Sequence, residues 1–186
     1  MNLGKGLVVV AALSLSGGAF AAGEAPYAGW QDRAIKALSA EQIDDLRKGR
    51  GMGLALPAEL NGYPGPRHVL DLADQLELTP TQQAEAQELF DAMQAQAIVL
   101  GEQVLAAETT LDRLFATGSP SDAEILAGAI EVGRLQGVLR AHHLRYHLAM
   151  REVLSPHQVV RYQQLRGYSA DGRHGHGDHG EMRHAP

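Results

Sequence analysis

Residues 80–116 carry one unbroken apolar pattern, and it constrains the fold more than any other feature of the chain. Apolar residues recur there at alternating steps of four and three, at Ala86, Phe90, Met93, Ala97, Leu100, Val104, Ala107, Leu111 and Leu114. This spacing marks one face of an α-helix of about 37 residues. Because a helix with such a face must bury it, we expect a second long element to pack against it.

A second helical pattern follows the sequence ATGSPSD at residues 116–122, where Ser121 is a candidate cap, and it continues to about residue 153. Its main apolar stripe comprises Val132, Leu135, Leu139, His142, Tyr146, Ala149 and Val153. A second stripe lies well round the helix, at Ile130, Gly133, Gly137, Ala141, Leu144 and Leu148. A helix with two apolar faces usually buries both. We expect the main stripe to meet residues 80–116, and the second to meet the short helices, a dimer partner or a client protein.

Three short phrases predict helix starts. LTPTQ occupies residues 78–82, LSPHQ residues 154–158, and the looser LSAEQ residues 38–42. Each places Gln three residues after Ser or Thr, so the hydroxyl can accept from the backbone N–H of Gln while the Gln side chain returns to the N–H of the cap. Pro80 and Pro156 then take the first helical position, where a missing N–H costs nothing. We interpret all three phrases as structural.

The remaining segments complete the predicted architecture. Residues 30–48 predict two short helices, the Gly- and Pro-rich residues 49–66 are typical of an extended linker, and residues 67–76 predict a short amphipathic helix. No segment has a strand pattern. The sequence therefore predicts an all-α fold, a long antiparallel helical hairpin over residues 67–167 with short flanking helices. An N-terminal helical segment and linker would occupy residues 22–66.

The first residues have the pattern of a secretory signal peptide. Lys5 precedes an apolar run from Leu7, small residues follow, and residues 19–21 read Ala-Phe-Ala, an A-x-A cleavage site. Serine and glycine interrupt the run, which is too short to span a bilayer. We therefore expect residues 1–21 to be removed, a periplasmic location, and no membrane span after cleavage.

Composition excludes several classes of function. The chain has no cysteine, which rules out thiol chemistry and disulfides, and its net charge of −6 gives no basic surface for nucleic acid. No H-E-x-x-H, G-x-S-x-G or P-loop motif occurs, and the GRGMG at residues 49–53 follows no predicted strand. We therefore expect neither an enzyme nor a nucleic-acid-binding protein.

The C-terminal segment is the first of two histidine clusters. After a last capped helix over residues 156–167, residues 168–186 are rich in Gly and His and are expected to be disordered. Candidate metal ligands in this tail are His174, His176 and His179. Neutral imidazoles on a flexible chain bind divalent metals without a preformed cage, although a solvated polar tail is the alternative.

The second cluster, RAHHLRYHLAM, lies on the second long helix. His143 and His147 are four residues apart, so both project from one face and can fill two positions of a metal site. The alternative for this pair is an exposed polar face shared with Arg140 and Arg151. His142 belongs to the main apolar stripe, and we interpret it as a packed, hydrogen-bonded core residue.

A third candidate ligand follows from the register of the hairpin. If the chain turns near residues 118–119, residue i of one long helix faces residue 237 − i of the other. The helix at residues 67–76 must fold back at about residue 78, which places His68 level with residue 88. Residue 88 faces residue 149, so His68 is expected to come near His147, to within about one helical turn.

The phrases LTPTQ and LSPHQ, each opening a helix on either side of a long hairpin, resemble the LTxxQ family, which includes the periplasmic chaperones Spy and CpxP and the metal-binding ZraP and CnrX. The resemblance covers roughly residues 67–167 and implies a small periplasmic helical protein, usually dimeric or larger. It also implies that His143, His147 and the tail histidines handle metal. Two departures are His157, where the motif usually carries Glu or Asp, and a cleavable N-terminus, where the sensor members have an anchor.

These observations predict a periplasmic, metal-responsive accessory protein that acts in envelope stress or heavy-metal homeostasis. Its metal would be zinc, nickel, cobalt or copper, because imidazole suits all four and no thiolate narrows the choice. The expected partners are a second copy in a homodimer or larger oligomer and an envelope signalling protein. The alternative function is an ATP-independent chaperone that shields apolar segments of unfolded clients.

Overall fold

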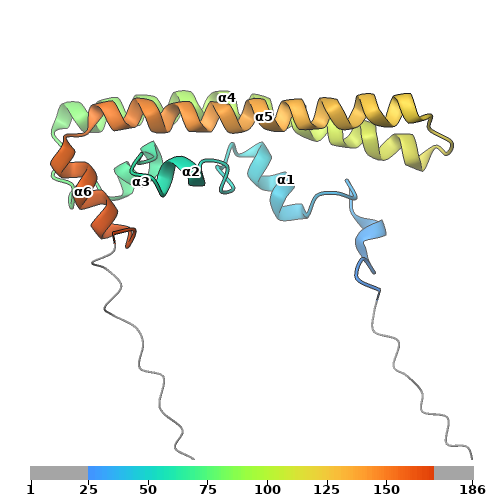
Figure 1. Cartoon of the computed structure of the whole chain (residues 1–186), viewed down its shortest axis with the longest axis horizontal. Helices are drawn as coiled ribbons and strands as arrows, with labels where there is room; N and C mark the ends of the chain where they lie inside the picture. Colours follow the sequence, from blue (N-terminus) through green and yellow to red (C-terminus); the bar gives the residue numbers. More distant parts are fainter. Residues whose placement is uncertain (1–24, 170–186) are drawn as a thin grey trace, which may run out of the picture.

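The structure is a computed structural model that describes residues 25–169, and in this range it contains helices and turns but no strand (Figure 1). The predicted signal peptide at residues 1–21 and the tail histidines lie outside the described residues. Among residues 25–169, no helix combines the length and the apolar character needed to cross a membrane.

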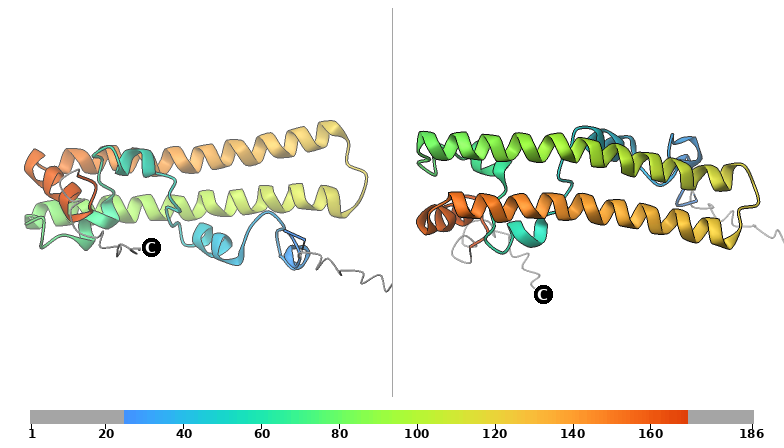
Figure 2. Two further views of the ribbon diagram at one scale, coloured as in Figure 1. Left: turned by 60° about the horizontal axis from the view of Figure 1, so that its bottom comes forward. Right: turned by 90° about the horizontal axis from the view of Figure 1, so that it is seen from above.

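Two long antiparallel helices dominate the molecule, as the two apolar patterns predict (Figures 1 and 2). Helix α4 (Pro80–Ala116) has 37 residues and α5 (Asp122–Val153) has 32. A short turn at residues 117–121 joins them, with Gly118 at φ +81° and Ser121 capping α5. The predicted helical hairpin and its turn are therefore confirmed.

Every predicted cap is present. Ser39 begins α1 (Ala40–Arg47), Thr79 begins α4 and Ser155 begins α6 (Pro156–Leu165), each with a complete capping box. A fourth box opens α5, where the carboxylate of Glu124 takes the place that Gln has in the other three. The three repeated phrases are thus helix starts.

The phrases LTPTQ and LSPHQ also contact each other, which their capping role alone does not predict. The side-chain amide of Gln82 donates to Gln158 Oε1 over 2.8 Å, and that of Gln158 donates to Gln82 Oε1 over 3.0 Å. The same two amides also donate to the carbonyls of Val153 (2.9 Å) and Leu76 (3.2 Å). The glutamine pair therefore fastens the start of α4 to the start of α6.

This reciprocal pair predicts an energetic coupling between the two motifs. In a double-mutant cycle, Gln82→Ala and Gln158→Ala should show a coupling of about 1 kcal/mol in the free energy of unfolding, because either change breaks the same paired bonds. Gln42→Ala is the control, since the Gln42 side chain completes only the box of α1. Paired with Gln82→Ala it should be additive. Coupling of equal size in both cycles would contradict this assignment.

The short elements line one side of the hairpin (Figure 1). They are η1 (Trp30–Asp32), α1, α2 (Leu56–Glu59), α3 (Pro66–Asp71) and α6. Helix α1 joins the middle of the hairpin in one apolar cluster that includes Leu38, Leu46, Leu100 and Leu139. The segments around α3 and α6 build a second cluster at the open end, with Val69, Met150 and Tyr162 fully buried.

Two predictions about the short elements need correction. Residues 49–66 are not an extended linker, because they include α2 and bury Pro64, Pro66 and Glu59. Glycines with positive φ at residues 49, 53 and 62 turn the chain back on itself, which holds this segment against the hairpin. The helix expected at residues 67–76 is also shorter, since α3 ends at Asp71 and turns follow.

Candidate functional site

A cavity of about 530 Å³ lies between the α2–α3 segment and the two long helices. Its walls come from four stretches of chain: residues 49–59, residues 65–68, Phe90 to Gln94 on α4, and His143 with His147 on α5. All three histidines predicted as ligands from the described residues, His68, His143 and His147, line it. The folding of residues 49–66 onto α5 is what creates this space.

Glu59, the last residue of α2, is the centre of the polar network beside the cavity. It is 4% exposed, and its Oε1 accepts a short hydrogen bond from the phenol of Tyr162 in α6. The backbone N–H of Gly65 donates to Oε2 over 3.2 Å, and His68 Nδ1 lies 3.2 Å from Oε1. Arg166 Nε lies 3.6 Å from Oε1. One carboxylate therefore joins α2, α3 and the C-terminal segment.

The network sets the charge state of this carboxylate. Burial alone would raise the pKa of Glu59, but hydrogen bonds from His68 and Tyr162, with the positive charge of His68 and His147, outweigh burial and lower the pKa below its usual value. The pKa of the Tyr162 phenol is raised, first by burial and then by its bond to Glu59. Glu59 is therefore an anion at neutral pH, and Tyr162 is a neutral donor.

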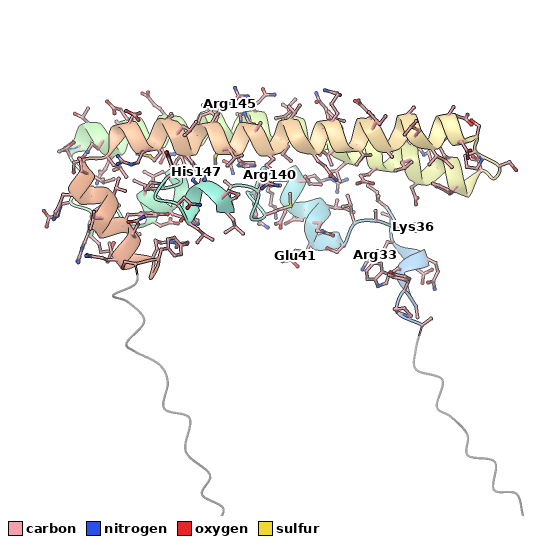
Figure 3. The ribbon with its side chains drawn as sticks, in the orientation of Figure 1. Arg33, Lys36, Glu41, Arg140, Arg145 and His147 are labelled. Carbon is pink, nitrogen blue, oxygen red and sulfur yellow. The ribbon has the colours of Figure 1, made fainter. Side chains whose placement is uncertain are left out.

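His147 is held in one orientation by the backbone. Its Nδ1 lies 2.7 Å from the carbonyl oxygen of Tyr63 and 3.7 Å from Glu59 Oε2. Because a carbonyl only accepts, Nδ1 carries the proton, and in the neutral ring Nε2 then has a free lone pair. Figure 3 shows this side chain on the side of α5 that faces the short helices. The arrangement fixes the tautomer that a metal ligand needs.

Gly65 leaves the Nε2 side of His147 uncovered. A β-carbon at position 65 would lie 2.8 Å from Cε1 and 3.0 Å from Nε2 of the ring. Any larger residue would therefore have to displace the imidazole or sit on its free nitrogen. The close approach of the His147 ring is what requires glycine at position 65. A special backbone conformation does not, since this residue is extended (φ −85°).

His143, one helical turn before His147, is 2% exposed, and its Nε2 is buried without a hydrogen-bond partner. Burial in the first place, together with the charges of His142 and His147, lowers the pKa of His143 to about 4. The ring is therefore neutral at physiological pH. The alternative of an exposed polar face is wrong for this pair, because α2 and α3 cover it.

The remaining two histidine predictions are confirmed. His142 is a buried core residue whose Nε2 donates to the carbonyl of Met93 on α4 over 2.8 Å. His68 comes near His147 as the register predicted, since the two rings approach opposite oxygens of Glu59, at 3.2 and 3.7 Å. The hairpin register therefore brought to one carboxylate two residues that lie 79 positions apart in the sequence.

The histidines around the cavity do not by themselves form a complete metal centre among the described residues. Within residues 25–169, no group of three or more His, Asp or Glu side chains is arranged so that it could hold a metal ion. His68 and His147 use Nδ1 toward Glu59 and Tyr63, which leaves the Nε2 atoms of His68, His143 and His147 without a hydrogen bond among the described residues, and that of His143 is buried. The tail candidates His174, His176 and His179 lie outside the described residues.

Glu59, Tyr162 and Arg166 were not among the residues singled out in the sequence. Glu59 lies in the Gly- and Pro-rich stretch, and the other two belong to the short final helix and its end. Only the presence of a lone Glu in an otherwise apolar stretch, LALPAEL, could have marked Glu59 beforehand.

Comparison of the chain with known protein families, with curated proteins and with solved structures finds no match. The resemblance to the LTxxQ family therefore rests on the two motifs and the hairpin between them.

Proposed function

We propose that the protein binds a divalent transition metal at the cavity beneath α5, through His143 and His147. The observation that carries this proposal is the pair of buried imidazoles one helical turn apart, each with a free Nε2 at the same cavity. The Nε2 of His143 has no partner in the protein. A buried, unpaired nitrogen costs about 1–3 kcal/mol, which a bound ion would recover.

The remaining polar groups suit a supporting role. The Tyr63 carbonyl orients His147, and Glu59 sits behind His68 and His147 as a buried anion. Such outer partners raise the basicity of ligating imidazoles and strengthen metal binding. Two protein donors leave the other coordination positions for water or for ligands from the tail or a partner. These open positions would let a second molecule contact the bound ion, which suits a metal-responsive protein.

Imidazole donors without thiolate favour zinc, nickel, cobalt or copper. The signal-peptide pattern and the LTxxQ resemblance support a periplasmic role in envelope stress or heavy-metal homeostasis, with an envelope signalling protein as the partner that reads the metal-bound state. The prediction that this is not an enzyme stands on the absence of catalytic motifs in the sequence.

Calorimetric titration with zinc and nickel tests the proposal. A chain ending at residue 168 should keep one tight site, because the helix already fixes both imidazoles. His143→Ala with His147→Ala should abolish that site, while His157→Ala, which removes an exposed imidazole from α6, should leave it unchanged. Gly65→Ala should weaken binding without removing a donor. Circular dichroism of every variant checks that the helices persist.

Loss of all binding on removal of the tail would contradict the proposal and assign metal binding to residues 169–186. Equal loss in His157→Ala and in the His143/His147 variant would show that the measured binding is not specific to the cavity.

A chaperone function is the second candidate, and it has an observation of its own. Large apolar side chains near the tip of the hairpin are exposed to solvent, among them Phe115 (59%) and Leu126 (62%). Surfaces of this kind bind unfolded segments. Suppression of the aggregation of a denatured client at equimolar protein would support this function, and metal-independent suppression would separate it from the first.

A further inference from the structure

The cavity beneath α5 is larger than a metal ion needs. Its volume is about 530 Å³. A water molecule takes up about 30 Å³, so an ion with a few coordinated waters would fill only a fraction of this space. Pockets that hold small organic molecules range from roughly 300 to 1,000 Å³, and they combine apolar walls with a few well-placed polar groups. The side chains of the walls therefore decide what else the cavity holds.

One part of the wall is apolar and carries an aromatic ring and two thioethers. Its members are Met52, Ala55, Leu56, Pro66, Phe90 and Met93. Met93 is buried, Phe90 is half-buried, and Met52 is 40% exposed at the edge. Thioether sulfur makes favourable contacts with aromatic rings, and aromatic rings pack on one another in offset or edge-on arrangements. This wall therefore suits a flat aromatic body.

Arg67 supplies a charged group beside this wall. Its guanidinium lies over the Phe90 ring, with Cζ 5.6 Å from the ring centre. Its Nε is 3.0 Å from Oδ1 and 3.2 Å from Oδ2 of Asp71, four residues later in the chain. Among the described residues, its two terminal nitrogens have no hydrogen-bond or ion-pair partner. Asp71 therefore orients the guanidinium through Nε and leaves a pair of donors for a carboxylate.

The charges on the walls favour an anion. Arg50 and Arg67 line the cavity, whereas the three aspartates that pair with them do not. Among the lining residues that the structure describes, Glu59 is the one acid, and both of its oxygens already accept hydrogen bonds from the protein. An incoming molecule therefore meets unpaired guanidinium N–H groups, while the only carboxylate is already engaged.

We propose that the cavity binds a small aromatic carboxylate, with its ring against Phe90 and Met93 and its carboxylate on the terminal nitrogens of Arg67. The placement of Arg67 over Phe90 carries the inference, because an aromatic acid presents the two matching groups, a flat ring and a carboxylate, side by side. Two parallel bonds from one guanidinium to a carboxylate are among the strongest hydrogen-bonded contacts in proteins. This site goes beyond the proposed metal site and requires no ion.

Two other classes of ligand fit these walls less well. An inorganic anion such as phosphate would use Arg67 and leave the apolar wall in contact with water. A neutral aromatic molecule would cover the wall and displace water from the free N–H groups of Arg67 without replacing its hydrogen bonds, which is costly. Only a ligand with both groups uses the whole site, so benzoate, benzamide and phosphate are the probes that separate the three classes.

Titration of the metal-free full chain with benzoate and with 2-naphthoate tests the proposal, followed by the shifts of backbone amide resonances in NMR spectra. Both acids should bind at one saturable site. 2-Naphthoate should bind more tightly, because its second ring buries more apolar surface. Benzamide keeps the ring without the charge and should bind about tenfold more weakly than benzoate or worse, the usual value of a hydrogen bond to a charged group.

Variants of Arg67 and Phe90 assign the two halves of the site. Arg67→Gln should weaken benzoate binding about tenfold or more and leave benzamide binding unchanged. Arg67→Lys should be intermediate, since an ammonium keeps the charge but lacks the planar pair of donors. Phe90→Leu should weaken both acids. Arg145→Gln is the matched control and should bind like the wild type, because Arg145 is exposed on the side of α5 opposite His147 (Figure 3).

Equal affinity for benzoate and benzamide would overturn the proposal, as would benzoate binding that survives Arg67→Gln. The absence of saturable binding by both acids in the millimolar range would also overturn it. Displacement of benzoate by an equal concentration of phosphate would show that Arg67 binds anions without the apolar wall, which contradicts the assigned ligand class. Circular dichroism checks that each variant is folded. Because the protein is free of metal, failure here leaves the zinc titration of the His143/His147 variant as a separate test.

Discussion

Replacing Gly101 with alanine should destabilise the protein by about 3 kcal/mol, the upper end of the usual cost of forcing an extra methyl group into a packed site. A β-carbon at position 101 would lie 2.2 Å from the carbonyl oxygen of Leu46, 2.8 Å from its carbonyl carbon and 3.2 Å from its Cα. All three are backbone atoms at the end of α1, so no side-chain rotation relieves the clash. Helix α1 must therefore move away from α4.

That movement exposes apolar surface. Ile35, Leu38 and Leu46 are each less than a tenth exposed and belong to the cluster that joins α1 to the hairpin. Each such side chain contributes roughly 1.5–3 kcal/mol by burial. The opposing term is helix propensity, since alanine in a helix interior is favoured over glycine by about 1 kcal/mol. The packing term is larger, so the sign of the change is destabilising.

The matched control is Gly133→Ala in α5, where a β-carbon meets nothing within 4 Å. This change should stabilise the protein by up to about 1 kcal/mol, because only helix propensity acts there. Urea unfolding followed by circular dichroism measures both variants. Stabilisation of both to the same extent would show that α1 does not pack on Gly101 as the structure has it.

The hairpin was predictable because its signals are local and repeated. Apolar residues that recur every three or four positions indicate a helix from the local sequence alone. A Ser or Thr with Gln three residues later indicates where the helix begins. The rigidity of two long helices also explains why a register argument placed His68 beside His147. Each residue adds the same 1.5 Å of rise, so errors over the hairpin stay within about one turn.

The cavity was not predictable in the same way. Residues 49–66 have the glycine and proline content of a linker, and propensity says nothing about where a linker folds. Glu59 becomes the centre of the network only because three glycines with positive φ turn this stretch back onto α5. The pairing of Gln82 with Gln158 was hidden for a related reason. Each side chain already has a local role as a capping partner, and nothing in the sequence shows that the two caps meet.

The buried state of His143 and His147 was likewise decided by tertiary contacts. Their helix carries Arg140 and Arg145 nearby, which is typical of a solvated face, and both arginines are exposed. The two histidines lie on the adjacent side of the same helix, where the folded stretch 49–66 covers them. A helix alone cannot show which of its polar sides a neighbouring segment will cover.

Replacing Glu59 with alanine should lower the free energy of unfolding by about 3 kcal/mol. The change leaves the buried phenol of Tyr162 and the N–H of Gly65 without their acceptor. It also removes the anion that His68 and Arg166 approach. Glu59→Gln should cost less, because its amide oxygen can still accept one bond. Glu85→Ala, at an exposed position of α4, is the control and should change stability by no more than about 0.5 kcal/mol.

Acidification separates the stability contributed by the charge of Glu59 from the stability contributed by its hydrogen bonds. In the native protein its pKa is lowered from the usual 4.5, since the bonds from His68 and Tyr162 outweigh the effect of burial. As pH falls below 4.5, the carboxyl group of Glu59 becomes protonated in the unfolded chain while it is still ionised in the native protein. The stability that this charge contributes is therefore fully present above pH 4.5 and is lost as pH falls through the native pKa. Glu59→Gln has no such proton to bind. The stability difference between wild type and Glu59→Gln should therefore be constant from neutral pH to about 5 and shrink at lower pH. A difference that stays constant down to pH 3 would mean that Glu59 acts through its hydrogen-bonding shape and not through its charge.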